Sequence, residues 1–462
     1  MQFRIENLGP IKCADIDLNK KLTIFCGHNN TGKTYLSYLI YAIVSYKLNT
    51  KQGINKDQVL SLLSGDAVTI IINPTELWEY KKAMAQNIIS ECDSIFGISN
   101  DTVLTIFKNL KIDFSDTLEG CEKKLYDMEF VHQAQIGELK LKFEKTKLKN
   151  EVTITPFEKC DLPDENFLPF VPMLIRTAMF YYLATHPIYN THIFPVERMS
   201  IYTFKTELSM SRNALIDQMQ RLNKGEEMNV FEFLHKSSKR YPVAIKDGLE
   251  IANDLTNVQK HKSEYYELAT EIEGLLLDGS MLSNKNGDVL YSSNRAGKSK
   301  KLPIHISASI VKSLSSLVFY LKHIAKKDSL IIIDEPEMNL HPNSQRILVH
   351  VLGKLINSGL RLLVSTHSDY IIREINNLIM ANEAMARGID ISIYNYSPSI
   401  LISKEDVNVY FFKYRSKKYV EINNVDVSSY GFAVESIDET IELQNRIAEN
   451  LFYTLKYPED EC

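Results

Sequence analysis

The stretch FCGHNNTGKTYL, residues 25–36, decides the fold, because Gly27 to Thr34 satisfy the pattern G-x-x-x-x-G-K-[ST]. In this pattern the glycines let backbone N–H groups close round a phosphate. The lysine reaches the outer phosphates, and the threonine hydroxyl binds Mg²⁺ at a helix N-terminus. The sequence therefore predicts a nucleotide-binding loop. The residues expected to contact the nucleotide are Gly27, Asn29, Asn30, Thr31, Gly32, Lys33 and Thr34, with Thr34 also a metal ligand.

The sequence around this loop has the order that such a loop requires. The apolar run KLTIFCG, residues 21–27, predicts a strand, and YLSYLIYAIVSYKL, residues 35–48, predicts a helix that is buried on most faces. Before them, residues 1–18 predict two short strands around a Gly9-Pro10 turn. A chance match to the bare pattern would lack this strand, loop and helix context.

A second informative stretch is SLIIIDEPEMNLHP, residues 329–342. Its apolar residues 330–333 predict a buried strand that delivers Asp334 and Glu335 at its carboxyl end, where open α/β sheets bind their ligands. We expect Asp334 to hold Mg²⁺ through water and Glu335 to orient or deprotonate the attacking water. The alternative is an acidic surface turn.

A third stretch, RLLVSTHSDYII at residues 361–372, predicts another buried strand that runs into Ser365, Thr366 and His367. A histidine at this place could merely cap the following helix. Beside the first two stretches, a contact of His367 with the γ-phosphate is the preferred interpretation. The predicted catalytic residues are thus Glu335, His367 and Lys33.

Bulk composition limits the function classes. At 462 residues the chain should form two or three packed units, and its net charge of −5 gives no global attraction to nucleic acid or to an anionic membrane. Six scattered cysteines without C-x-x-C spacing argue against a zinc site or a disulfide framework and suit a reducing cytoplasm. The sequence has no secretory signal pattern, and its most apolar run, from Leu168, is too short to span a bilayer. We expect a cytoplasmic protein without a membrane partner.

Two further segments lie between these motifs. ELKLKFEKTKLK, residues 138–149, alternates and predicts an exposed β-ribbon whose lysines form a solvated face rather than a nucleic-acid contact. Residues 206–277 are charged and helical in pattern, which predicts a helical hairpin or short coiled coil that projects from the core. This insertion is our expected recognition element.

The three motifs together resemble those of the ABC-type ATPases of the RecF, Rad50 and SMC group, and more narrowly the compact AAA-15/OLD-like ATPases of bacterial anti-phage systems. The resemblance covers the first 45 residues and most of 190–450. It implies an α/β fold, an ABC-type P-loop ATPase head, with ATP and Mg²⁺ as ligands and hydrolysis of ATP to ADP and phosphate. The implied parts are a β-rich N-terminal lobe with the P-loop (1–205), the helical insertion (206–277) and a C-terminal lobe (278–462).

The resemblance also implies a signature segment, which we assign to HISASIVKSLSSL, residues 305–317. In the family, its serine contacts the γ-phosphate held by another subunit, so ATP joins two ATPase faces; Ser309 and Ser307 are the candidates. Ile310 stands where relatives usually carry glycine. The alternative is a plain core helix that begins at Ser309. Gln133 and Gln135 are both candidates for the family's Q-loop glutamine, and Arg198 in FPVERMSIY is either structural or phosphate-facing.

The resemblance implies a role in defence. In PARIS-type systems, an AriA-like ATPase forms a homo-oligomeric scaffold and holds a separate nuclease effector of the AriB-like Toprim/DUF4435 kind, which it releases when it senses a phage trigger protein. The alternatives are the ATPase of a Septu-like or retron-associated system with an HNH nuclease, a RecF- or Rad50-like repair ATPase that binds DNA, and a pseudo-ATPase that binds ATP as a structural clamp. No Toprim domain is expected after the segment 431–451.

Overall fold

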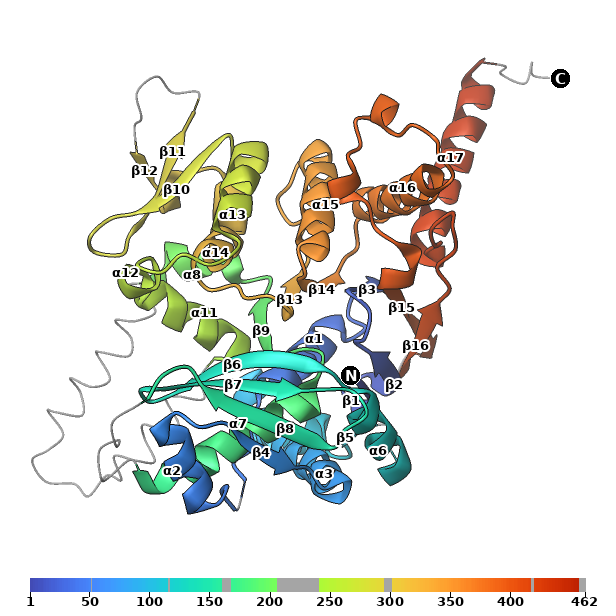
Figure 1. The fold of residues 1–462 in the computed structure, drawn as a ribbon. Coiled ribbons are helices and arrows are strands. Elements are labelled where there is room, and N and C mark those ends of the chain that lie inside the picture. Colours follow the sequence, from blue (N-terminus) through green and yellow to red (C-terminus); the bar gives the residue numbers. More distant parts are fainter. Residues whose placement is uncertain are drawn as a thin grey trace, which may run out of the picture.

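The computed structural model of the protein describes residues 1–50, 52–114, 117–159, 168–205, 241–294, 301–416 and 419–456. Its centre is a nine-stranded sheet in the order β5-β1-β2-β16-β15-β3-β14-β13-β9 (Figure 1). The strands are β1 (Gln2–Leu8), β2 (Ile11–Asp17), β3 (Leu22–Gly27), β5 (Lys111–Asp113), β9 (Asn190–Phe194), β13 (Ser329–Asp334), β14 (Arg361–Ser365), β15 (Val407–Ser416) and β16 (Tyr419–Val425). The sequence predicted β1, β2, β3, β13 and β14.

The sheet has a parallel part and an antiparallel part. Strands β15, β3, β14, β13 and β9 all pair in parallel, whereas β1 pairs antiparallel with both β2 and β5, and β15 pairs antiparallel with β16. Parallel strands need covering helices on both faces. Because β3, β14 and β13 run in the same direction, their carboxyl ends meet at one edge of the sheet. This is expected for a P-loop ATPase head with a β-rich N-terminal lobe.

The sheet separates two apolar cores. Alternate residues of β13 point to opposite faces: Leu330 and Ile332 join one core, and Ile331 and Ile333 join the other. Helices α1, α3 and α7 lie in the first core, and α13, α14, α15 and α16 lie in the second. Their bounds are α1 (Lys33–Ser45), α3 (Pro74–Ser90), α7 (Val171–Thr185), α13 (Tyr266–Ile272), α14 (Ser309–His323), α15 (Pro342–Asn357) and α16 (Asp369–Ala386). All six residues of β13 are buried, which explains its unbroken apolar sequence.

The first core is completed by a second sheet, of order β4-β8-β7-β6. Its strands are β4 (Val68–Ile71), β6 (Phe130–Ile136), β7 (Leu139–Lys145) and β8 (Glu151–Pro156), and nearby helices are α2 (Lys56–Ser64), α4 (Cys92–Phe96), α5 (Asn100–Ile106) and α6 (Leu118–Asp127). The predicted strand at 138–149 exists as β7, but it is an inner strand and not a free ribbon. Lys140 and Lys142 lie on its more exposed face, as predicted, whereas Lys145 is buried and donates hydrogen bonds to main-chain carbonyls.

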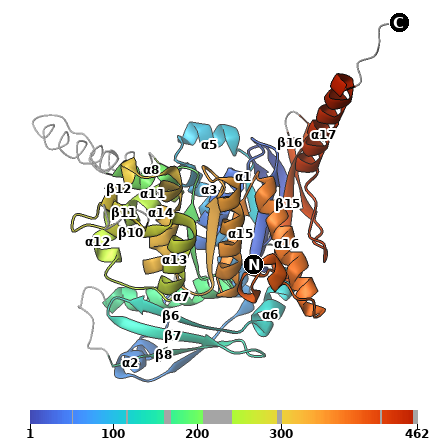
Figure 2. The same cartoon turned by 90° about the horizontal axis from the view of Figure 1, so that it is seen from above.

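The insertion predicted at 206–277 differs from expectation where the structure describes it, at 241–277; residues 206–240 lie outside the described part. Helices α11 (Val243–Asn253), α12 (Leu255–Val258) and α13, with the π-helical turn Glu273–Leu277, lie against α8 (Arg198–Thr203) and α14 instead of projecting (Figure 2). Ala252, Leu255 and Ile272 are fully buried. The periodic apolar residues of this stretch therefore belong to the second core. A small sheet of β10 (Gly279–Ser283), β11 (Val289–Ser293) and β12 (Lys301–Pro303) follows.

One helix stands apart from both cores. Helix α17 (Glu435–Lys456) extends away from the rest of the molecule in both views (Figures 1 and 2). Within the described ranges, no helix combines the length and the apolar character that crossing a bilayer demands. The run from Leu168 is instead the largely buried helix α7 and the short turn before it. Cys13, Cys26, Cys92 and Cys121 carry free thiols, while Cys160 and Cys462 lie outside the described residues.

Candidate nucleotide-binding site

The P-loop connects β3 to α1 in a backbone conformation that glycine makes accessible. Gly27 has φ 124°, and a Cβ there would lie 2.2 Å from the Phe412 carbonyl oxygen, so β15 could not approach β3 as it does. Gly32 precedes α1 with φ 90°. The Lys33 Nζ donates hydrogen bonds to the carbonyls of Gly27 (3.3 Å) and His28 (2.7 Å). The loop thus forms a concave turn with its lysine folded across it.

Asp334 ends β13 directly opposite the start of α1. The Thr34 hydroxyl donates to Asp334 Oδ2 at 2.8 Å, and the Ser365 hydroxyl, from the end of β14, donates to the other carboxylate oxygen. Asp334 is 2% exposed. Parallel pairing of β13 with β14 places Asp334 opposite Ser365, which explains how residues from two distant motifs meet. The sequence did not single out Ser365 as the partner that orients Asp334.

Glu335 occupies a backbone conformation that is uncommon for a residue with a side chain. Its φ is 45°, in the left-handed region, which costs a non-glycine residue about 1–3 kcal/mol and persists only when neighbouring contacts enforce it. Its N–H donates to the Ser365 carbonyl at 3.1 Å, and its own carbonyl accepts from Arg198 at 2.8 Å. This conformation brings its carboxylate to 3.9 Å from His367 Nε2.

A second glutamate holds the segment that carries His367. The Glu337 Oε1 accepts hydrogen bonds from the Thr366 hydroxyl and from the His367 N–H, both at 2.8 Å. The other oxygen, Oε2, is buried and has no hydrogen-bond partner among the described residues. Burial is the main reason that the pKa of Glu337 is raised. Glu337 therefore fixes the position of His367 by accepting a hydrogen bond from the His367 backbone N–H. The sequence did not indicate this role for Glu337.

The predicted residues from the three motifs line one cavity of about 620 Å³ at the carboxyl edge of the parallel strands. This volume lies in the range of small-molecule sites. Its lining consists of Asn29, Asn30, Thr31, Gly32, Lys33, Thr34, Asp334, Glu335 and His367, together with Pro10 and Tyr35. Gly27 lies behind the loop and contributes its carbonyl. The structure therefore brings together the predicted catalytic, nucleotide-contacting and metal-ligating side chains, with one exception.

The exception is Ser309, which is exposed at the start of α14 and is not part of the cavity lining. Ser307 is buried and donates to the Pro303 carbonyl at 3.0 Å. The predicted helix at Ser309 is present, but nothing within the described chain brings its N-terminus to the P-loop of the same molecule. Any phosphate contact from Ser309 would have to be made to another copy.

The two glutamines considered for the Q-loop are wrongly placed for that role. Gln133 and Gln135 lie on β6 of the four-stranded sheet, and neither lines the cavity. Because β9 pairs with β13 in parallel, the residues just after β9 reach the edge of the site instead. Glu197 lies there, and its carboxylate helps to raise the pKa of Tyr38 on α1, although burial is the larger cause. Which residues reach the edge of the site depends on the order of the strands in the sheet. This order could not be predicted from the sequence alone.

Burial dominates the ionisation of the site. It lowers the pKa of Lys33 to about 8, against the opposing effect of Asp334, and it lowers the pKa of His367 to about 4, helped by the charge of Lys33. Burial and the charge of Asp334 both raise the pKa of Glu335, whereas Lys33 and Arg198 lower it. At neutral pH the site therefore contains a neutral imidazole beside the Glu335 carboxyl group, and a lysine that loses its proton more easily than an exposed lysine.

This arrangement fits a magnesium nucleotide. A concave backbone turn, a lysine and a helix N-terminus suit phosphates, and the Thr34–Asp334 pair offers the oxygen ligands that Mg²⁺ prefers. Within the described residues there is no group of three or more His, Cys, Asp or Glu that could hold a metal by itself. A cation shared between one carboxylate, one hydroxyl and phosphate oxygens needs no such group.

Comparison with known proteins gave matches at three levels. The sequence model of a family described as AAA ATPase domain matches residues 1–372. Septu protein PtuA of Bacillus thuringiensis is 25% identical over 209 residues, which are 41% of this chain and 44% of PtuA, so the chain spans less than half of that relative. Among solved structures, an Smc head domain bound to the C-terminal domain of ScpA, from Pyrococcus furiosus, has a TM-score of 0.35 at 13% identity and covers 97% of this chain and 98% of its own. The SMC head domain from Thermotoga maritima has a TM-score of 0.32 at 10% identity and covers 92% and 98%.

Proposed function

Because the chain belongs to the AAA ATPase domain family, we propose that its cavity binds ATP with Mg²⁺ and hydrolyses it to ADP and phosphate. The observation that carries this proposal is the meeting of Lys33, Asp334 and Glu335 in one cavity, although they come from distant parts of the sequence. A binding clamp without hydrolysis would need the lysine but would gain nothing from a strained glutamate beside a histidine.

Each side chain has a role in this reaction. Lys33 and the N–H groups of the P-loop bind the outer phosphates, and Thr34 with Asp334 would hold Mg²⁺, which neutralises phosphate charge when bound. Glu335 accepts a proton from the attacking water, for which its raised pKa is suited because the carboxylate is more basic. His367, neutral at physiological pH, donates or accepts a hydrogen bond next to Glu335 rather than adding charge.

The position of Ser309 supports ATP-dependent pairing of two or more copies. Ser309 is exposed at the N-terminus of a fifteen-residue helix, away from the cavity of its own chain. A helix N-terminus is a suitable contact for phosphate. We therefore propose a homo-oligomer in which ATP bound at Lys33 of one copy is covered by α14 of another.

We further propose that the ATPase serves as the sensor and scaffold of an anti-phage defence system with a separate nuclease effector. The likeness to Septu protein PtuA supports a defence system, and it favours the Septu-like alternative, with an HNH nuclease, over the PARIS-like one. In the PARIS-like case the partner is an AriB-like Toprim/DUF4435 nuclease, released on recognition of a phage trigger protein. The second candidate, a RecF- or Rad50-like repair ATPase, predicts direct DNA binding that weakens as salt is raised.

Affinity purification of the chain from cells that carry its own locus, with and without ATP and Mg²⁺, tests the defence proposal. A stoichiometric nuclease in a large complex supports it, and the type of nuclease decides between the PARIS-like and Septu-like forms. A complex that contains DNA and no nuclease would instead favour the repair ATPase.

The variant Lys33→Ala tests the nucleotide proposal in the same preparation. The expected result is loss of ATP binding and of protection against phage, because the phosphates lose their lysine. Full protection by a variant that no longer binds ATP would contradict a nucleotide-driven mechanism.

A further inference from the structure

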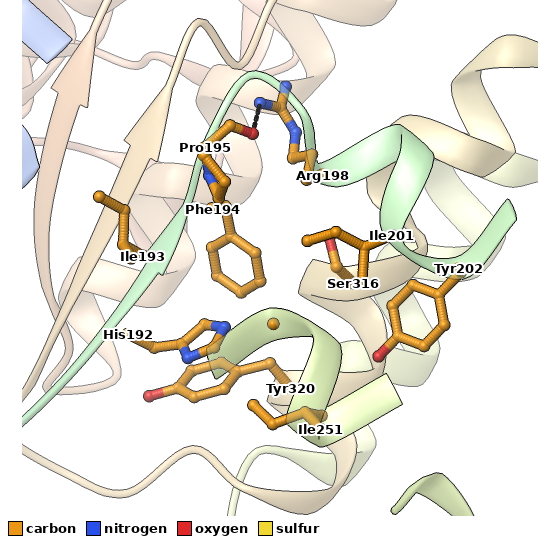
Figure 3. Close-up of a pocket in the computed structure, with 11 residues that line it drawn as sticks. His192, Ile193, Phe194, Pro195, Arg198, Ile201, Tyr202, Ile251, Ser316 and Tyr320 are labelled. Atoms are coloured by element: carbon orange, nitrogen blue, oxygen red, sulfur yellow. Dashed lines mark hydrogen bonds between the residues drawn. The ribbon is translucent and has the colours of Figure 1, made fainter. Parts of the chain in front are cut away.

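Arg198 is a buried cation that, within the described part of the chain, donates its hydrogen bonds to carbonyls and a hydroxyl and not to a carboxylate. Its side chain is 2% exposed and lies at the start of α8, just after β9. Its Nη1 donates to the carbonyls of Pro195 (3.0 Å) and Asp334 (2.6 Å), its Nη2 to the carbonyl of Glu335 (2.8 Å), and its Nε to the carbonyl of Ser313 (3.2 Å). Figure 3 shows the guanidinium beside Pro195, above the ring of Phe194. A buried guanidinium whose acceptors are mainly main-chain carbonyls fixes the geometry of those segments.

Two of these acceptors enclose the catalytic glutamate. The carbonyls of Asp334 and Glu335 lie on either side of the Glu335 Cα, so binding both fixes the two peptide groups that set its left-handed conformation. On the other side, the Glu335 N–H is bound by the Ser365 carbonyl. Without Arg198, the backbone strain at Glu335 would favour relaxation to an ordinary conformation, which would turn the carboxylate away from His367.

Another acceptor, the Ser313 carbonyl, belongs to the helix that begins with Ser309. Ser313 lies one turn further along α14, and its hydroxyl is 3.4 Å from Arg198 Nη2 and 3.4 Å from the carbonyl of Met338, three residues after Glu335. Arg198 and Ser313 therefore join α14, α8 and the end of β13 in one network. A shift of α14 relative to β13 cannot occur without changing the bonds that hold Glu335.

Packing around Arg198 is incomplete. Two cavities of about 10 Å³ each, large enough for about one water, flank Arg198. The first, drawn in Figure 3, lies between Phe194, Tyr320 and Ser316, whose hydroxyl is buried without a partner in the described chain. The second lies between Arg198, Leu317 and Pro336. Protein interiors are normally close-packed, so with free space beside it the position of the Arg198 side chain depends more on its hydrogen bonds than on packing.

We propose that Arg198 is a positioning residue that makes the orientation of Glu335 depend on the placement of α14. The inference rests on the proposed hydrolysis of ATP and extends it. Contact of α14 with a neighbouring copy would change the orientation of Glu335 through the Arg198 side chain. Arg198 does not line the nucleotide cavity, so it acts through the backbone of Asp334 and Glu335.

The variant Arg198→Lys, which keeps the charge but loses the forked donor, tests this dependence. We expect kcat to fall by at least about tenfold, since small misplacements of a catalytic group have effects of this size, while the Kd for ATP stays within about threefold. In a Glu335→Gln background, Arg198→Lys should cause no further loss of kcat, because the two act in one unit. Unchanged kcat, or a loss that adds fully to that of Glu335→Gln, would overturn the inference.

Matched controls separate positioning from general damage. Arg361→Lys is the first control. Arg361 is another largely buried arginine that donates hydrogen bonds to main-chain carbonyls, but it lies at the start of β14, the end away from the nucleotide cavity. We expect this variant to leave kcat within about twofold. If Arg198→Lys does not fold, Ser313→Ala removes only the hydroxyl contacts, and Ser315→Ala is its control because the Ser315 hydroxyl bonds only locally to the Lys312 carbonyl. We expect kcat to fall several-fold for Ser313→Ala alone; equal rates for the two serine variants would overturn the inference.

Turnover by the unmodified protein is measured first, with ATP and Mg²⁺ over a range of protein concentrations. Absence of turnover in the unmodified protein would refute the proposed hydrolysis, and this inference with it. Normal turnover in the unmodified protein together with normal turnover in Arg198→Lys and Ser313→Ala would refute the positioning role alone.

Discussion

At the scale of single residues, Lys33 makes nucleotide binding sensitive to pH. Burial lowers its pKa to about 8, so its ammonium is charged below that value and becomes neutral as the pH rises through it. If phosphate binding needs the charged form, the competent fraction falls from roughly nine tenths at pH 7 to roughly one tenth at pH 9, and the Kd for ATP should rise about tenfold. Calorimetry at both values, in buffers of different ionisation enthalpy, should also detect proton uptake on binding near pH 8. Equal affinity at pH 7 and pH 9 would contradict this role of burial.

Glu335 is the residue whose loss should separate binding from chemistry. In Glu335→Gln the amide keeps the size of the side chain but cannot accept a proton, so we expect ATP binding to persist while turnover falls by about 10²-fold or more. The measurement is steady-state phosphate release together with equilibrium ATP binding. A turnover rate equal to that of the unmodified protein would remove Glu335 from the catalytic role.

The site residues that could be predicted from the sequence are those that belong to a contiguous motif. Lys33 and Thr34 follow from one loop pattern, and Asp334 and Glu335 from a buried strand that ends in acid. Arg198, Ser365 and Glu337 act instead through hydrogen bonds to the backbone or to motif residues far away in the chain. The spacing of residues along the chain does not predict such hydrogen bonds, because they depend on which strands lie next to each other.

At the scale of elements, buried strands and helices were predictable and surface placement was not. Strands β3 and β13 are buried along their whole length, so their apolar runs identified them. The helical pattern of 241–277 was real as well, but periodicity cannot tell a projecting arm from helices that lie on a core. The boundaries at residues 205 and 277 stay predictions, since the first adjoins residues outside the described part.

Helix α15 offers a stability test at this scale. Gly353 faces the chain at η5 (Pro398–Ile400), and a Cβ there would lie 2.1 Å from the Ile400 carbonyl oxygen. Gly353→Ala should therefore lower the free energy of unfolding by roughly 1–3 kcal/mol, despite the better helix propensity of alanine. Thermal unfolding followed by circular dichroism measures the change.

Gly274 is the matched control, because a Cβ at this exposed helical glycine would meet nothing within 4 Å. We expect Gly274→Ala to leave the melting temperature unchanged or slightly raised. An equal loss of stability in both variants would mean that the close approach of the Ile400 carbonyl is not the reason for glycine at position 353.

At the scale of the whole molecule, the exposure of Ser309 predicts ATP-dependent assembly. Glu335→Gln, which should retain ATP, is expected to form a larger species when ATP and Mg²⁺ are added, and Ser309→Arg in that background should keep the nucleotide-free mass. Light scattering after size exclusion measures both. Ser64→Arg, at an exposed serine on the last residue of α2, is the control and should assemble normally. Assembly that survives Ser309→Arg would place the contact between copies elsewhere.

The order of the strands also has a consequence for how the protein is made. Strand β3 carries the P-loop and leaves the ribosome early, but its two neighbours in the sheet, β14 and β15, are among the last strands to be translated. Until they arrive, β3 has two open edges that could pair with other chains, so the nascent protein depends on being shielded. The nucleotide site has all of its lining residues only after Asp334, Glu335 and His367 have been translated, long after the P-loop. A prematurely terminated product that ends before β13 lacks Asp334, Glu335 and His367, so we expect it neither to hydrolyse ATP nor to take a faulty place in an assembly that ATP holds together.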